Sequence, residues 1–144
     1  MWRLAIFYFF FLLNSNIAFG QSVTPVSDSN RKASKSLLIT EKDTKGVFYL
    51  KKNGRLTIKL GENPSTGASW QFIKSIDSIL FSKKNTSFKT DPNRVPNTPG
   101  VGGTRFWIYK AVKSGTNTVV MHYGRHGQGV PWKAVSFTIK IVDK

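Results

Sequence analysis

Apolar and polar residues alternate in short runs along most of the chain. In the clearest run, Leu56, Ile58 and Leu60 are separated by single polar residues. Because successive side chains of a β-strand point to opposite faces, this alternation predicts a strand with one buried and one solvated face. Runs of this kind, or short continuous apolar runs, occupy residues 47–50, 56–60, 70–73, 104–112, 118–123 and 136–141.

An Asn-Gly pair separates the first two of these runs. Asn53-Gly54 lies between residues 47–50 and 56–60. Asn and Gly adopt the positive φ angles of a two-residue hairpin turn more readily than other residues do. We therefore expect these two runs to pair with each other as a β-hairpin.

The pattern as a whole favours a fold made of strands. No segment shows the apolar periodicity of an amphipathic helix, and residues 76–81 are compatible with either one more strand or a helical turn. Short strands joined by loops rich in Gly, Pro and Asn are typical of two packed sheets. The sequence predicts an all-β fold, an immunoglobulin-like β-sandwich of about seven or eight strands.

The N-terminus (1–20) has the composition of a secretory signal peptide. Arg3 supplies a positive charge, residues 4–13 are continuously apolar, and the small residues Ala18 and Gly20 precede Gln21. We expect cleavage before Gln21, and hence a secreted or periplasmic protein without stable membrane insertion. The alternative is an uncleaved anchor, but such a short apolar run is unlike the segments that cross about 30 Å of hydrocarbon.

The rest of the chain divides into a flexible segment and one domain. Residues 21–36 are rich in Ser, Asn, Lys and Thr and have no periodicity, as is typical of a flexible terminus. Residues 37–144 are sufficient for one domain with its own core, which we expect to be monomeric.

Basic residues far outnumber acidic ones. The chain has 22 Lys and Arg against 7 Asp and Glu, a formal net charge of +15. Such a charge favours an acidic partner or serves solubility alone. The lysines are scattered along the chain rather than gathered on one helix, so we expect no specific site for nucleic acid.

Residues suited to catalysis are few. The absence of Cys excludes thiol catalysis, Cys-ligated metals and disulfides. His122 and His126 have a spacing that suits a metal only on a helix with a neighbouring Glu, and the carboxylates show no paired pattern. We therefore expect neither an enzyme nor a bound metal or other cofactor.

Glycine and proline are concentrated in three connections, here called loop 1 (residues 63–67), loop 2 (residues 100–103) and loop 3 (residues 124–132). In loop 1, Pro64 restricts the backbone and Gly67 can adopt positive φ, which predicts a rigid exposed turn. The glycines of loop 2 would let a foreign backbone come close. In a Greek-key sandwich the three loops can emerge at one end, and a rigid scaffold that presents several loops is typical of a binding protein.

The first two loops resemble the motifs of a known family. Loop 1 is Asn63-Pro64-Ser65-Thr66-Gly67, followed by Trp70, and resembles the Asn-Pro-Thr-Thr-Gly…Trp signature of the chagasin-like cysteine protease inhibitors. Loop 2 is Gly100-Val101-Gly102-Gly103 and resembles the family's Gly-x-Gly-Gly motif. Two motifs in order, at a similar spacing, make the resemblance specific, and it extends over residues 37–143.

The third motif departs from the family pattern, in which Arg-Pro-Trp follows a strand-ending Tyr. Here Tyr123 and Arg125 are present, but a Pro-Trp pair occurs only at Pro131-Trp132. In one interpretation, loop 3 has a changed course, and Trp132 reaches the position of the family's Trp from the C-terminal side of the loop. In the other, Trp132 is a core or rim residue, and Arg125 is the only protease contact of the motif that is retained. The first interpretation is favoured because it explains the Pro-Trp pair.

The resemblance implies a reversible, non-covalent, competitive inhibitor of papain-like, cathepsin-like cysteine proteases. Thr66 would lie nearest the catalytic Cys, loop 2 along the substrate side, and Arg125 with Trp132 on the leaving-group side. The implied protease-binding residues are Asn63, Pro64, Ser65, Thr66, Gly67, Gly100, Val101, Gly102, Gly103, Arg125, Pro131 and Trp132. The alternative function is a secreted basic immunoglobulin-like module that binds anionic polysaccharide, lipid or nucleic acid.

Overall fold

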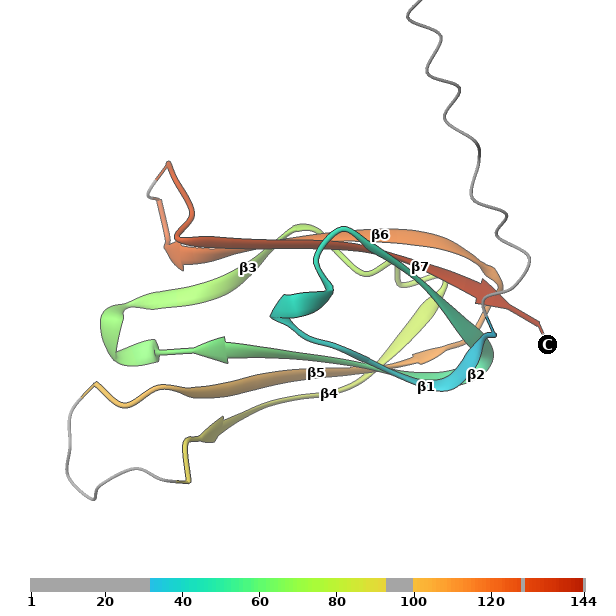
Figure 1. Ribbon diagram of the computed structural model, residues 1–144, viewed down its shortest axis with the longest axis horizontal. Coiled ribbons are helices and arrows are strands. Elements are labelled where there is room, and N and C mark those ends of the chain that lie inside the picture. The colour runs from blue at the N-terminus through green and yellow to red at the C-terminus, as the bar shows by residue number, and fades with distance from the viewer. Residues whose placement is uncertain (1–31, 93–99, 128, 144) are drawn as a thin grey trace, which may run out of the picture.

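Seven β-strands form two layers in the residues that the computed structural model describes, which are 32–92, 100–127 and 129–143 (Figure 1). They are β1 (Ser34–Ile39), β2 (Gly46–Glu62), β3 (Ala68–Lys74), β4 (Phe81–Thr90), β5 (Gly103–Ala111), β6 (Gly115–Arg125) and β7 (Lys133–Val142). Helical structure in the same residues is limited to two short 3-10 helices, η2 (Glu41–Asp43) and η3 (Pro64–Thr66), and no helix there could span a bilayer. The expected signal peptide and residues 21–31 lie outside the described residues.

Strand β2 belongs to both layers. Its residues 46–51 pair in parallel with β7, and its residues 55–62 pair antiparallel with β5. Strands β6 and β3 complete one layer, while β4 and β1 complete the other. The order of hydrogen-bonded strands is therefore β3-β6-β7-β2-β5-β4, with β1 beside β2. This all-β architecture confirms the predicted sandwich.

The prediction of a β-hairpin at Asn53-Gly54 is wrong. Residues 47–50 and 56–60 do not pair with each other, because they are two parts of one long strand that bends from one layer into the other (Figure 1). Asn53 has a φ of 66°, in the left-handed region. Asn53 thus provides the positive φ expected of it, but the chain turns into the second layer instead of back on itself.

Two strands were not expected from the sequence, and one ambiguous segment forms a turn. The last two residues of segment 76–81 both donate backbone N–H bonds to the Asp77 carbonyl, so the helical-turn alternative is the closer one. Strand β4 begins at Phe81 and is mostly polar. Strand β1 begins at Ser34, inside the segment expected to be flexible.

The core lies between the layers, on the inward faces of the alternating strands. Leu56 and Ile58 of β2 are fully buried, as are Val119 and Met121 of β6. The alternation of buried and exposed residues on these strands is the one that the sequence predicts. Because the chain contains no Cys, the packing stabilises the fold without disulfides.

A methyl group at Gly54 is expected to destabilise the bend of β2. A Cβ there would lie 2.6 Å from the Lys51 carbonyl oxygen, 2.8 Å from Leu50 Cδ1 and 2.9 Å from the Lys35 carbonyl oxygen. Two of these atoms belong to the backbone, so the strands would have to move apart. We expect Gly54→Ala to lower the free energy of unfolding by about 1–3 kcal/mol, measured by urea denaturation.

The matched control for this variant is Gly129→Ala. No atom lies within 4 Å of a Cβ built at Gly129. Its effect on the free energy of unfolding should therefore stay within about 0.5 kcal/mol. Equal stability of the two variants would contradict the close packing at the bend.

Candidate functional site

The three glycine-rich loops lie side by side at one end of the sandwich (Figure 1). Asn63 Nδ2 in loop 1 donates to the Gly100 carbonyl oxygen in loop 2 over 2.7 Å. Arg125 Nε in loop 3 donates to the Thr66 carbonyl oxygen in loop 1 over 2.9 Å. Loop 1 is therefore the middle of the three and is bonded to both neighbours.

The Asn63 side chain caps the short helix η3 inside loop 1. Its Oδ1 accepts bonds from the Ser65 N–H at 3.3 Å and from the Ser65 hydroxyl at 2.7 Å. Gly67 ends the turn with a φ of 74°, and its N–H donates to the Pro64 carbonyl oxygen over 3.0 Å. The turn is therefore held by its own side chains and backbone, as the sequence predicts.

The Thr66 hydroxyl is also used inside the loop. It donates to the Asn63 carbonyl oxygen over 2.7 Å and accepts the Ala68 N–H at 3.2 Å. The side chain remains partly exposed. Thr66 thus presents a fixed surface at the tip, with its hydroxyl already engaged.

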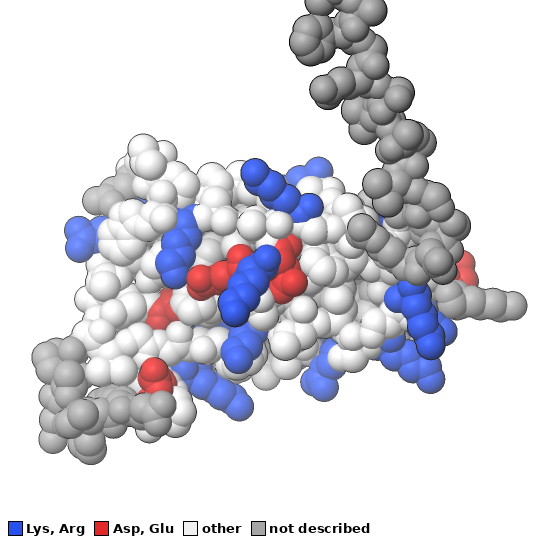
Figure 2. Space-filling view, viewed as in Figure 1, with Lys and Arg blue, Asp and Glu red and all other residues white. Residues whose placement is uncertain are grey.

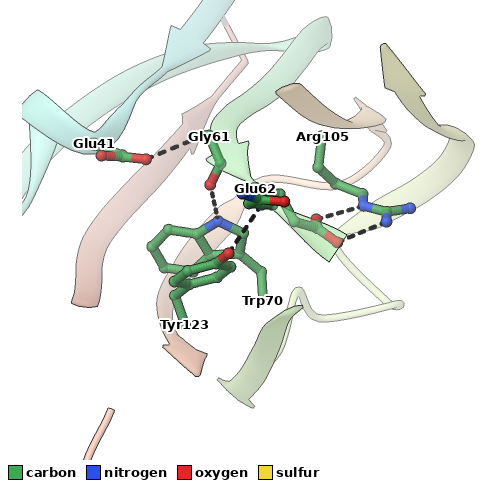
Figure 3. Close-up of polar contacts among 7 residues, drawn as sticks. Glu41, Gly61, Glu62, Trp70, Arg105 and Tyr123 are labelled. Atoms are coloured by element: carbon green, nitrogen blue, oxygen red, sulfur yellow. Dashed lines mark hydrogen bonds and ion pairs between the residues drawn. The ribbon is translucent and has the colours of Figure 1, made fainter. Parts of the chain in front are cut away.

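Two aromatic side chains anchor the base of loop 1 (Figure 3). Trp70 Nε1 donates to the Gly61 carbonyl oxygen over 2.8 Å, and the Tyr123 hydroxyl accepts the Asn63 N–H at 2.9 Å. The two rings pack with their centroids 5.3 Å apart, and both residues are at most 7% exposed. Trp70 therefore supports the loop from the core.

A buried ion pair ties the start of loop 1 to β5 (Figure 3). Arg105 Nε and Nη2 donate to the two carboxylate oxygens of Glu62 over 2.6 and 2.7 Å. The Glu62 side chain is 2% exposed and that of Arg105 is 30% exposed. The hydrogen bonds to Glu62 raise the pKa of Arg105 above its ordinary value, so the guanidinium stays charged.

The glycines of loop 2 make room for the protein's own chain. A Cβ at Gly102 would lie 3.1 Å from the Glu62 carbonyl oxygen, and one at Gly103 would lie 2.6 Å from the ring of Phe88. Gly100 has a φ of 83°. The missing side chains therefore make room for loop 1 and β4, and the approach of a foreign backbone to loop 2 stays a prediction.

Trp132 lies beside Arg125 in loop 3 and is 49% exposed. Its N–H donates to the Tyr123 carbonyl oxygen over 2.8 Å, and its ring packs edge-on against Tyr123 with centroids 5.9 Å apart. The Arg125 guanidinium carbon lies 5.7 Å from the centre of the Trp132 ring. Trp132 is therefore not a core residue, and the preceding Pro131 is partly buried next to it.

A groove of about 830 Å³ runs beside the three loops. Thr66 of loop 1, Gly102 of loop 2 and Trp132 of loop 3 all contribute to its lining. Pro64, Ser65 and Gly67 are exposed at the tip of loop 1, and Val101 is partly exposed in loop 2. The twelve residues singled out from the sequence are thus all found at this end of the sandwich.

Metal-binding clusters are absent from residues 32–92, 100–127 and 129–143, where no group of three His, Cys, Asp or Glu side chains comes together. His122 projects outward from β6 between the buried Met121 and Tyr123, and His126 is exposed in loop 3.

Comparison with known families identifies the group to which these features belong. The model of the chagasin family peptidase inhibitors (I42) matches residues 49–141, well over half of the chain. The chain belongs to the chagasin family. Membership of this inhibitor family confirms the predicted resemblance to the chagasin-like inhibitors, and it confirms that the chain is not an enzyme.

Two of the similar proteins come from Entamoeba histolytica. Amoebiasin-2 of Entamoeba histolytica is 26% identical over 96 residues, which cover 67% of this chain and 72% of amoebiasin-2. The crystal structure of the cysteine protease inhibitor EhICP2 from the same organism superimposes with a TM-score of 0.65 and 25% identity, over 74% of this chain and 96% of EhICP2. The solution structure of amebosin has the same fold, with a TM-score of 0.51 and 19% identity over 74% of this chain and 98% of amebosin.

This chagasin-family domain holds its loops with residues that the motifs did not single out. Glu62 and Arg105 occupy inward positions of β2 and β5, where the other residues are apolar. Because buried charges are nearly always paired, the alternation of the predicted strand 56–60, continued to Glu62, together with Arg105 on the predicted strand 104–112, could have indicated the ion pair. The bond from Asn63 to the Tyr123 hydroxyl had no comparable signal, since it joins residues 60 positions apart.

Proposed function

We propose that this protein is an exported, reversible, non-covalent and competitive inhibitor of papain-like cysteine proteases, with its three loops occluding the active-site cleft. The observation that carries the proposal is the pair of bonds from Asn63 to Gly100 and from Arg125 to Thr66, which unite the loops into one edge. EhICP2, at 25% identity, is a cysteine protease inhibitor, which supports this class of target. Export rests on the composition of residues 1–20.

The hydrogen bonds inside loop 1 suit an inhibitor that binds without being cleaved or covalently modified. Because Asn63, Ser65 and Thr66 are already bonded within the turn, little conformational entropy is lost when a protease binds it. The Thr66 hydroxyl is not paired with a base that could activate it, and it donates to a backbone carbonyl. Binding therefore requires no covalent step with the catalytic Cys.

The flanking loops would contact the two sides of the cleft. Loop 2 would lie along the substrate side, with its backbone bonded as a bound peptide would be. Arg125 and Trp132 would lie on the leaving-group side, where the exposed part of Trp132 can pack against apolar enzyme surface. The packing of Trp132 on Tyr123 keeps this aromatic surface in place before binding.

Steady-state kinetics with papain and a small peptide substrate test this mode of inhibition. We expect the apparent inhibition constant to rise linearly with substrate concentration, because substrate and inhibitor exclude each other. Dilution of the complex should restore full protease activity and release intact inhibitor. Inhibition that is independent of substrate concentration, or inhibitor cleaved within loop 1, would contradict the proposed mode.

A further inference from the structure

Exposed cations lie on the outer face of the layer β1-β2-β5-β4. Inward residues alternate with outward ones on β2 and β5, and the outward cations of the layer β1-β2-β5-β4 are all exposed. Four of them lie in regular register and are considered together: Arg55, Lys59, Lys89 and Lys110. We call them the basic face; in Figure 2, which views the sandwich from its edge, blue side chains project along this lower layer.

No carboxylate occupies an outward position on these four strands as described. Glu62 points inward to Arg105, and Asp91 follows the end of β4. Glu41 lies near β2 but is paired with Lys133 and accepts the Gly61 N–H. The carboxylates near the basic face thus lie at its margin, where Glu41 and Asp91 share hollows with Lys59.

The other layer has fewer outward cations on its central strands. The outward positions of β6 and β7 carry mostly small or neutral residues, such as Thr118, Val120 and Thr138. Thr118 and Thr138 bond to each other, and the cation among these positions, Lys140, packs over the ring of Tyr49. The two central strands of this layer thus carry one outward cation, while Lys51 of β2 and Lys74 of β3 add two more nearer its margins.

Two of the cations are direct cross-strand neighbours. Arg55 of β2 is opposite Lys110 of β5 in the antiparallel register, and the residues on either side of this pair are Ser36 and Ser82. Like charges directly opposite each other destabilise a sheet. Two like charges held opposite each other create a local positive potential that attracts an anion.

The second pair of cations surrounds an aromatic ring. Lys59 is opposite Phe106 in the register, and Lys89 Nζ lies 5.7 Å from the centre of the same ring. Arg55 and Lys59 are four residues apart on one strand, which corresponds to about 13 Å. Leu38 and Ile108 occupy outward positions of the neutral row between the two pairs.

We propose that the basic face binds a sulfated polysaccharide, whose negative charges repeat along an extended chain. Two cationic pairs separated by a neutral row match repeated charges along an extended ligand better than a compact phosphate. Nucleic acid is less well matched, because the one aromatic ring among these outward residues is covered by Lys89 and single strands require open rings for stacking. The face is built from strand surfaces, and Lys59, Lys89 and Phe106 at one end of it also line the groove beside the three loops.

The test compares two variants of the purified protein with equal net charge. In the first, Arg55, Lys59, Lys89 and Lys110 are changed to Gln. In the second, four lysines away from the basic face are changed to Gln; they are Lys45, Lys51, Lys74 and Lys113. Binding to heparin is measured by titration at several salt concentrations, with desulfated heparin as the ligand control.

We expect the first variant to lose about tenfold or more in affinity at physiological salt and to show a shallower dependence on salt, whereas the second stays within about threefold of the wild type. Equal losses in both variants would overturn the proposal, because binding would then follow net charge alone. Tighter binding to single-stranded DNA or to vesicles of anionic phospholipid than to heparin would overturn it in favour of those ligands.

Folding is checked with the single variant Arg55→Gln, which removes the like-charge pair. Its urea midpoint should equal or exceed that of the wild type. A lower midpoint would show that Arg55 stabilises the sheet, which would contradict the inference drawn from its position opposite Lys110. The heparin measurement does not involve a protease, so its outcome is independent of the proposed inhibition.

Discussion

Replacing Thr66 with glutamate is expected to weaken inhibition of papain by at least about a hundredfold. Thr66 is at the tip of the middle loop, and the proposed complex brings it nearest the catalytic Cys. A longer, charged side chain there would meet the enzyme surface before the flanking loops could engage, and its carboxylate would lose its hydration. Inhibition constants of the wild type and Thr66→Glu against papain provide the measurement.

The control variant is Thr66→Ser, which retains the hydroxyl that bonds the Asn63 carbonyl and the Ala68 N–H. It should change the inhibition constant by no more than about tenfold, since one methyl group is lost. Both variants should remain folded in urea denaturation. Wild-type inhibition by a folded Thr66→Glu would exclude the tip of loop 1 from the interface.

The second large effect is expected from Arg105→Gln, which should lower the free energy of unfolding by about 3 kcal/mol. The change leaves the Glu62 carboxylate, which is 2% exposed, without its cationic partner. Removing one partner of a buried ion pair costs more than the pair contributes, because the remaining charge cannot be hydrated. Urea denaturation at neutral pH gives the difference from the wild type.

The reciprocal variant, Glu62→Gln, is expected to be less damaging. The Arg105 guanidinium is 30% exposed, so water can solvate it, and a Gln oxygen can still accept one of its bonds. If Glu62→Gln were the more destabilising of the two, the carboxylate would not be the group that depends on the pair. Both variants also loosen the start of loop 1, so weaker protease inhibition should accompany the loss of stability.

The strands with strict alternation could be predicted from the sequence, and those without it could not. Residues 56–60 and 136–141 alternate cleanly, because each contributes one face to the core. Strand β4 has no such pattern, since it is at the edge of its sheet and carries mainly polar residues. Edge strands are held by one neighbour and tolerate polar side chains on both faces.

The Asn-Gly pair shows why a local signal can support two topologies. A positive φ at Asn53 is compatible with a hairpin and equally with a bend inside one long strand. The choice depends on partners distant in sequence, namely β7 for residues 46–51 and β5 for residues 55–62. Such long-range pairings leave no trace in the residues of the turn.

The sequence predicted which residues form the candidate site better than it predicted the contacts that hold them in place. The motifs of loops 1 and 2 indicated the residues that meet at one end, and a resemblance to a family carried that inference. The contacts that hold them, such as Tyr123 with Asn63, became visible only from the fold. The packing of loop 1 and β4 against the loop 2 glycines could not be predicted either, because a sequence does not reveal which neighbour takes the space that a missing side chain leaves.

Titration of active-site-calibrated papain with the purified protein is the most direct test of the central proposal, that the united loops block a thiol protease. We expect residual activity to fall in proportion to added protein and to reach its minimum near one molecule of inhibitor per active site. Undiminished papain activity in a large molar excess of the folded protein would contradict the proposal, provided that a cathepsin-L-like enzyme, assayed in parallel, is also unaffected.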